Sequence, residues 1–211
     1  MTRVRADDYD DKKQLIIRRA AKLFASKGFE SATMAEVAML CKASKSHLYH
    51  YFPAKEDLLF EVVSEHTRRL TDIVEALVLL PLPADERFGR FVTSFIEQAA
   101  DSRDEHLVLV NDLKYLPEAK GRQIRQMEGR IVDLVIDLLA EINPDAASLR
   151  ARRPYALLLF GMLIWTFTWY HKTGEITPRE LADRIAQLFL HGFRDHEFVA
   201  SNKENADLLP T

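Results

Sequence analysis

The chain has 211 residues, 47% of them hydrophobic, which suits one large domain or two small ones with a well-buried core. Only 7 glycines and 8 prolines leave long uninterrupted stretches, which favours helices over a turn-rich all-β fold. The single cysteine, Cys41, excludes an internal disulfide and agrees with a reducing cytoplasm. The charged N-terminus has no apolar segment of the kind found in signal peptides.

Charge is distributed unevenly along the chain, although the net charge is only −3. Residues 1–60 hold 11 Lys and Arg against 8 Asp and Glu, whereas residues 61–211 hold 18 against 24. A basic N-terminal segment followed by an acidic remainder fits a DNA-binding unit attached to a domain that does not bind DNA.

The first residues, 1–10, are predicted to form a charged flexible arm, followed by a helix over about 11–27 that ends at Gly28. A second helix follows Thr33, because Thr33 and Glu36 have the spacing of a capping box. A third helix starts after Ser44 as N-cap and runs to about Phe52, where Pro53 ends it. Two short helices joined by a tight turn are typical of a helix-turn-helix motif.

On the third of these helices, Leu48 and Phe52 are four residues apart and are expected to face the core. The opposite, exposed side carries Lys, Ser, His and Tyr side chains, which can contact guanine edges or phosphates in a DNA major groove. The predicted DNA-binding residues are Thr33, Ser44, Lys45, Ser46, His47, Tyr49, His50, Tyr51 and Lys55. We expect Lys45, Ser46, His47 and His50 to approach bases, and Thr33, Tyr49, Tyr51 and Lys55 to hold phosphates. An ordinary helical hairpin with a solvated polar face is the alternative.

Residues 12–60 resemble the DNA-binding domain of TetR-type bacterial repressors. The resemblance rests on S-K-S-H-L-Y-H-Y-F-P-A-K-E-D-L-L, preceded by an A-x-x-L-F-A-x-x-G-F helix and a T-M-x-x-V-A segment. The chain departs from the family pattern at Lys42, Ser46 and His47, where similar sequences usually have Gly, often Gly, and Thr. Ser46 and His47 fall on the exposed side, so they are expected to change the preferred operator rather than abolish binding.

The remaining sequence predicts further helices at about 55–80, 84–101, 104–113, 117–141, 147–171 and 178–195, with 196–211 as a flexible tail. The expected fold class is all-α. A three-helix N-terminal DNA-binding domain with the helix-turn-helix (11–54, the head) would carry a helical ligand-binding and dimerisation domain (55–195, the body).

Residues 155–170 are almost entirely apolar, but about 16 residues fall short of the roughly 20 that cross a bilayer. This segment is therefore predicted to be buried on all sides, partly against a second subunit. A companion apolar stripe on the last helix comprises Leu181, Ile185, Leu188, Phe189 and Gly192. Two helices from each subunit would form a homodimer interface, as the TetR resemblance also implies.

The body is expected to hold a ligand pocket, because such pockets form between helices with a few orienting polar groups. The candidate pocket residues are Phe91, Phe95, Tyr115, Trp165 and Trp169 as lining, with His66, Asn111 and Thr168 as orienting groups. The alternative is that most of these aromatic residues are ordinary core.

Two segments, Y-L-P-E-A-K-G-R-Q-I-R-Q-M-E and L-L-L-F-G-M-L-I-W-T-F-T-W-Y-H-K-T-G, are similar to TetR-type regulators of fatty-acid, aromatic-acid or steroid-ring catabolism. Such relatives often respond to acyl-CoA thioesters, whose phosphates need cations. The basic stretches that could supply them are Lys120, Arg122, Arg125 and Arg130, and Arg150, Arg152 and Arg153.

No catalytic motif is present: there is no His-Glu-x-x-His, no phosphate-binding glycine loop and no Gly-x-Ser-x-Gly. The chain is therefore predicted not to be an enzyme and to need no metal or cofactor. The predicted function is a ligand-responsive transcriptional regulator, a repressor released from a palindromic DNA operator by a small apolar inducer, such as an acyl-CoA. The alternative is a helical adaptor or membrane-surface protein that does not bind DNA.

Overall fold

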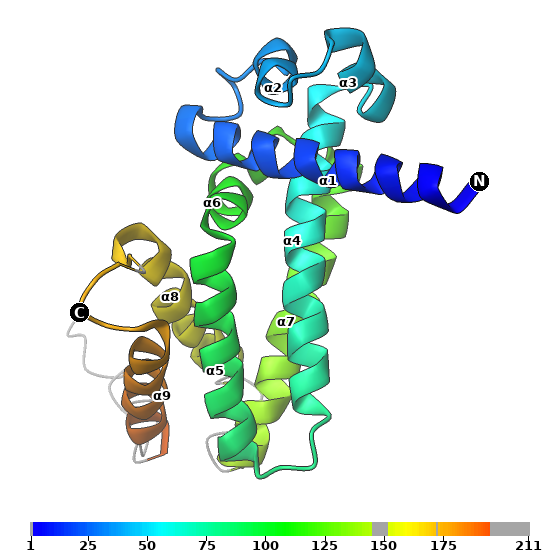
Figure 1. The fold of residues 1–211 in the computed structure, drawn as a ribbon. Helices are drawn as coiled ribbons and strands as arrows, with labels where there is room; N and C mark the ends of the chain where they lie inside the picture. The colour runs from blue at the N-terminus through cyan, green and yellow to red at the C-terminus, as the bar shows by residue number, and fades with distance from the viewer. Residues whose placement is uncertain (1, 145–151, 172, 195–211) are drawn as a thin grey trace, which may run out of the picture.

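The computed structural model describes residues 2–144, 152–171 and 173–194, and all regular elements in these ranges are helical. The predicted all-α fold class is therefore confirmed. Figure 1 shows α1 (Thr2–Lys27), α2 (Met34–Leu40) and α3 (Lys45–Tyr51) gathered at one end of the molecule. The other elements are α4 (Lys55–Val78), α5 (Ala84–Asp101), α6 (Arg103–Asp112), the 3-10 helix η1 (Leu113–Tyr115), α7 (Glu118–Ile142), α8 (Arg152–Trp169) and α9 (Pro178–Arg194).

Buried apolar side chains form two separate clusters, and α4 contributes to both. Its first half, including Leu59 and Val63, packs with α1, α2 and α3 in the head. Its second half, including Leu70 and Val74, packs with α5, α7, α8 and α9 in the body. Helix α7 likewise contributes Ile124 to the head cluster and Ile131 to the body cluster, and the head cluster also includes Leu109 of α6. Helices α4 and α7 are therefore continuous physical links between the head and the body.

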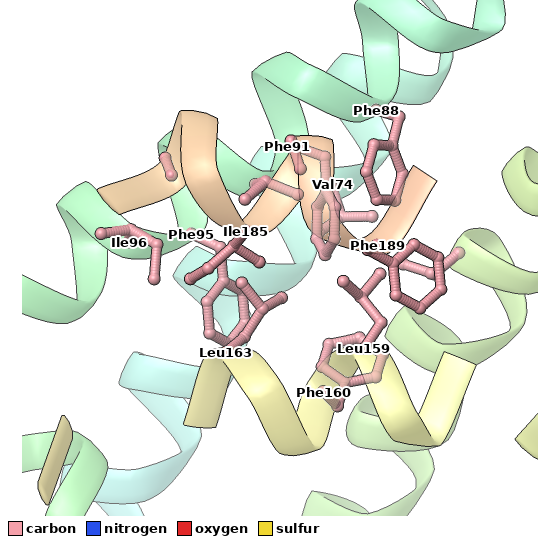
Figure 2. Packing of buried hydrophobic residues seen from close by; sticks show 14 of the residues in the cluster. Val74, Phe88, Phe91, Phe95, Ile96, Leu159, Phe160, Leu163, Ile185 and Phe189 are labelled. Atoms are coloured by element: carbon pink, nitrogen blue, oxygen red, sulfur yellow. The ribbon is translucent and has the colours of Figure 1, made fainter. Parts of the chain in front are cut away.

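The body core is built largely from aromatic and branched side chains on α5, α8 and α9 (Figure 2). Phe88 stacks on Phe189 with ring centroids 5.6 Å apart, and Phe91 meets Phe160 edge-on at 6.2 Å. Such geometries add to the free energy gained by burying the rings. Phe91 was predicted to line a ligand pocket, but the structure places it within this packed core.

Helix ends follow the local signals of the sequence. Gly28 directly follows α1 with a φ of 82°, a left-handed conformation that glycine adopts without steric cost. Before α9, the Thr177 hydroxyl accepts a hydrogen bond from the Glu180 backbone N–H at 3.2 Å, and the Glu180 carboxylate accepts one from the Thr177 N–H at 2.8 Å. This capping box fixes the start of α9.

Several boundaries differ from the predicted ones. Helix α1 begins at Thr2 rather than near residue 11, because no Gly or Pro interrupts residues 2–27. The predicted helix start at 147 and the predicted tail, 196–211, lie outside the described residues. Within the described ranges, no helix combines the length and apolar character that crossing a bilayer requires.

Candidate nucleic-acid interface and ligand cavity

The capping box that was predicted for α2 is present. Thr33 donates its backbone N–H to Glu36 Oε2 at 2.9 Å, and its Oγ1 accepts from the Glu36 N–H at 3.3 Å. Lys27 also donates to the Glu36 carboxylate. The Lys27 hydrogen bond, followed by those of Thr33, lowers the pKa of Glu36 to about 2. The start of α2 is thus held to the end of α1.

The turn between α2 and α3 is a Schellman motif with an unusual residue in it. The Ala43 N–H donates to Ala38 O at 2.9 Å, and the Lys42 N–H donates to Met39 O at 3.1 Å. Lys42 is the residue of this motif with a left-handed backbone, at a φ of 51°. Sequences similar to this chain usually have glycine there. Lys42 therefore adopts a left-handed backbone conformation at a steric cost that glycine would not have.

Helix α3 presents one buried side and one exposed side, as the spacing predicted. The Ser44 hydroxyl accepts a hydrogen bond from the His47 N–H at 3.1 Å, which confirms Ser44 as the N-cap. Leu48 is fully buried in the head core, and Phe52 follows it there. The exposed residues are Ser44, Lys45, Ser46, His47, Tyr49 and His50. Their contacts with bases and phosphates stay predictions.

Tyr51, the last residue of α3, is half-buried because its ring packs against α1. Its ring stacks on Tyr9 of α1 with centroids 4.6 Å apart, and His47 meets it edge-on at 5.2 Å. Tyr9 had been assigned to a flexible arm, so this contact was missed. The sequence signal for this contact was the presence of aromatic residues at 9 and 51, each beside a polar helix face. The stack helps to fix the orientation of α3 against α1.

Lys55 was predicted to hold a phosphate, but its ammonium group already has three acceptors. Nζ donates to the carbonyl oxygens of Phe29, Glu30 and Ala32 at 2.8, 3.2 and 2.9 Å. It also lies 4.3 Å from the centroid of the Phe29 ring. All three ammonium protons are therefore engaged in closing the loop between α1 and α2. This geometry supports a structural role for Lys55 in the head.

An apolar cavity of about 160 Å³ lies in the body between α4, α5, α6, α7 and α8. Its polar wall residues are Thr67, His106 and Glu128. The other lining residues are Leu70, Phe95, Leu109, Ile131, Val132, Leu157, Phe160 and Ile164. An apolar cavity between helices with a few polar groups has the general character of a small-molecule site.

Of the residues predicted to line a ligand pocket, only Phe95 lies in the wall of this cavity. Trp165, Trp169, Thr168 and Asn111 are instead exposed. Tyr115 packs on Phe29 of the head with ring centroids 5.3 Å apart. The prediction failed because α8 has apolar residues all round it. Its sequence alone does not show which side faces the cavity.

His66 and His106 form a buried pair that joins α4 to α6, with His66 Nε2 and His106 Nδ1 3.1 Å apart. Burial lowers the pKa of His66 to about 4 and that of His106 to about 3. His66 was a predicted orienting group, whereas His106, which contacts the cavity directly, was missed. Its three-residue spacing from Leu109 on the inner side of α6 was the only sequence signal.

A further exposed surface lies on α8 and α9. Trp165 is 66% exposed and Leu158 is 63% exposed, and both lie on the outer side of α8. Leu188 on α9 is 70% exposed. Large apolar side chains gathered on neighbouring helices commonly mark an interface with another protein chain.

Comparisons with known proteins agree with this architecture. Residues 81–193 match the family model of the tetracyclin repressor-like C-terminal domain, and residues 16–62 match that of bacterial regulatory proteins of the tetR family. The crystal structure of a TetR-family transcriptional regulator from Bordetella parapertussis 12822 superposes with a TM-score of 0.82. It is 34% identical in sequence, over 87% of this chain and 96% of that one.

Two other relatives are more distant. The HTH-type transcriptional repressor NicS of Pseudomonas putida is 27% identical over 137 residues, which is 64% of each protein. AibR, in its crystal structure with isovaleryl coenzyme A and operator DNA, shares the fold with a TM-score of 0.74 and 22% identity, over 84% of this chain and 97% of that one. The chain spans only 19% of another curated regulator that it matches. These relatives are transcriptional regulators and not enzymes.

Proposed function

The chain belongs to the TetR family of bacterial transcriptional regulators, and we propose that it is a repressor that a small apolar inducer releases from DNA. TetR regulators bind DNA operators and small-molecule ligands, and they act as homodimers. The inducer site is the cavity between α4, α5, α6, α7 and α8. The other function considered from the sequence, a helical adaptor that does not bind DNA, has no counterpart among these relatives.

One observation carries this proposal: Leu109 belongs both to the cavity wall and to the core of the head. A ligand that displaces Leu109 therefore acts on the packing of α6 against α1. On α4, Thr67 lines the cavity and Val63, one helical turn earlier, is buried in the head core. Movement of either helix at the cavity is thus transmitted directly to the DNA-binding helices.

The exposed apolar side of α8 and α9 is the proposed dimer surface, with Leu158, Trp165 and Leu188 at its centre. Two heads would then meet successive major grooves of a palindromic operator, with half-sites about 34–36 Å apart. The ligand must bind more tightly to a dimer whose heads no longer match this spacing, because equal affinity for both conformations would shift nothing.

The chemical form of the inducer is the finer part of the proposal. AibR was crystallised with isovaleryl coenzyme A, and the acyl part of such a thioester is small and apolar. The phosphates would have to lie outside a cavity of about 160 Å³. Arg122, Arg130 and Arg153, which were predicted to hold them, already form ion pairs with carboxylates. We propose a free small molecule that the cavity holds, and a CoA thioester whose phosphates replace the carboxylates in these exposed ion pairs is the second candidate.

In vitro selection from a random DNA pool, followed by gel shifts of the enriched sequences, tests DNA binding. The expected result is a palindromic sequence bound by a dimer. The affinity for DNA should fall as the salt concentration rises. His47→Ala should change which sequences are enriched, because His47 is exposed on α3. No enrichment above the starting pool would contradict the proposed function, and an unchanged preference in the variant would contradict the assignment of the base-reading side.

A further inference from the structure

The buried His66–His106 pair has two nitrogens without a hydrogen-bond partner. His66 Nδ1 and His106 Nε2 are closed off from solvent, and neither has a partner among the described residues. Leaving a buried donor or acceptor unpaired is unfavourable, so native proteins rarely keep one without a function. His106 is 3% exposed and forms part of the cavity wall.

We propose that this cavity selects an uncharged, compact apolar ligand with a single hydrogen-bonding group, and that this group pairs with His106 Nε2. The inference rests on the proposed function, in which the cavity is the inducer site, and it assigns the chemical class of the inducer. His106 is the residue that distinguishes this ligand from a plain hydrocarbon of the same shape.

The histidine pair can match either a donor or an acceptor on the ligand. One hydrogen bond joins the rings, so one of the two inner nitrogens carries a proton and the other does not. If His66 Nε2 donates to His106 Nδ1, then His106 Nε2 carries its own proton and donates to the ligand. If His106 Nδ1 donates, then Nε2 accepts. The two tautomeric arrangements therefore allow the pair to bind a ketone, a hydroxyl or an amide.

Neighbouring rings hold His106 in one orientation before a ligand arrives. Phe167 stacks on it with centroids 3.5 Å apart, and Phe95 lies edge-on at 6.4 Å. Because Nε2 is closed off in the ligand-free protein, a ligand must displace part of the wall to reach it. The displaced helix would be α6, which carries His106 and also packs in the head core through Leu109. Recognition of the polar group and movement of the head are thus coupled.

The ligand-free cavity has room for a single ring or a short branched chain. The cavity of about 160 Å³ is similar to an engineered apolar cavity of about 150 Å³ that binds benzene in another protein. Nucleotide and pantetheine groups do not fit into this volume. A compact phenol or cyclic ketone does.

Charge in the cavity wall disfavours a carboxylate ligand. Burial lowers the pKa of both histidines, so they are neutral near pH 7 and offer no cation. The carboxyl group of Glu128 lines the same cavity, and burial raises its pKa while Arg125 acts in the opposite direction. A ligand carboxylate would lose its hydration in this apolar cavity and would meet no cationic side chain among the lining residues.

Calorimetric titration at pH 7.5 with phenol, toluene and benzoate tests the proposal on the full chain. The comparison uses the wild type, His106→Asn, which keeps an amide near Nδ1 to bond His66, and His106→Gln, which places an amide near Nε2. We expect His106→Asn to weaken phenol binding about tenfold and to leave toluene binding within about twofold. His106→Gln should restore phenol binding at least partly, and benzoate should not compete.

Nitrogen NMR of the histidine-labelled wild type gives a measurement that does not depend on the variants. The resonance of His106 Nε2 should shift with phenol and stay in place with toluene. Tighter binding of benzoate, equal losses for phenol and toluene in His106→Asn, or no aromatic binding up to the solubility limit would each overturn the inference. DNA binding is measured separately by gel shift. Loss of ligand selectivity with intact operator binding therefore defeats this inference alone, whereas absent operator binding defeats the proposed function.

Discussion

The head and the body differ in how completely their polar groups are hydrogen-bonded. In the head, the cap of α2, the cap of α3 and the Lys55 ammonium each have hydrogen-bond partners at normal distances. In the body, four buried side-chain nitrogens have none within the described part of the chain. They belong to His66, Arg69, Arg103 and His106, which all lie on α4 and α6. Unpaired polar groups are therefore concentrated in the helices that connect the cavity with the head.

This difference agrees with a rigid DNA-reading unit attached to a unit that changes conformation. A reading surface needs fixed side chains, and complete pairing of polar groups fixes them. A switching element needs two arrangements of similar free energy, and unpaired groups raise the free energy of the ligand-free arrangement. The four predictions below test this contrast, from the largest expected effect to the smallest.

A charge placed on the proposed dimer surface should have the largest effect on DNA binding. Leu188→Glu buries a carboxylate at the centre of that surface, so the protein should become monomeric and lose about 100-fold or more in operator affinity. Analytical ultracentrifugation and gel shifts measure both effects. Leu79→Glu, at the end of α4 where the side chain is 81% exposed, is the matched control. A dimeric Leu188→Glu protein would place the interface elsewhere.

Acid should destabilise the body through the buried histidines. Both have pKa values below the usual 6.5 when folded, so the unfolded chain binds more protons than the folded one once the pH falls below about 6.5. The free energy of unfolding should therefore fall by about 1–3 kcal/mol per pH unit between pH 6 and pH 4. Urea denaturation across this range gives the slope. His106→Asn should reduce it and His50→Asn, at an exposed position, should not. An equal pH dependence of the free energy of unfolding in all three proteins would show that the buried histidines do not cause it.

Removing the Lys55 ammonium should weaken the head rather than only its contact with DNA. Lys55→Met leaves three carbonyl oxygens without their donor, at an expected cost of about 1–3 kcal/mol in the free energy of unfolding. Lys45→Met, on the exposed side of α3, should leave stability unchanged and weaken DNA binding. An unchanged stability of Lys55→Met, together with a salt slope reduced by about one, would restore the phosphate contact expected from the sequence.

The smallest expected effect is a stabilisation. Lys42→Gly relieves the left-handed backbone conformation in the turn and should raise the free energy of unfolding by about 0.5–1 kcal/mol. Lys42→Ala removes the same charge but keeps the Cβ, so it should give no gain. Thermal unfolding of the two variants distinguishes backbone strain from charge. A stabilised alanine variant would show that the charge, not the backbone, is unfavourable there.

The sequence by itself determined the local structure of the head. These local features depend on neighbours within a few positions, so a short pattern was sufficient to predict them. They include the helix caps Thr33 and Ser44, the left-handed Gly28 and the burial of Leu48. The all-α fold followed in the same way, from long apolar periodicity without Gly or Pro. The family resemblance added the DNA-binding role, and the family matches bear it out.

Only the tertiary structure decided which side of each body helix faces which neighbour. Trp165 and Phe95 are both apolar residues on helices, yet one is exposed on the outside of α8 and the other lines the cavity. His66 and His106 are 40 residues apart and meet because α4 and α6 cross beside the head. The donors of Lys55 likewise meet carbonyl groups more than 20 residues away. Contacts of this kind arise from the packing of whole helices, and no local pattern of residues encodes them.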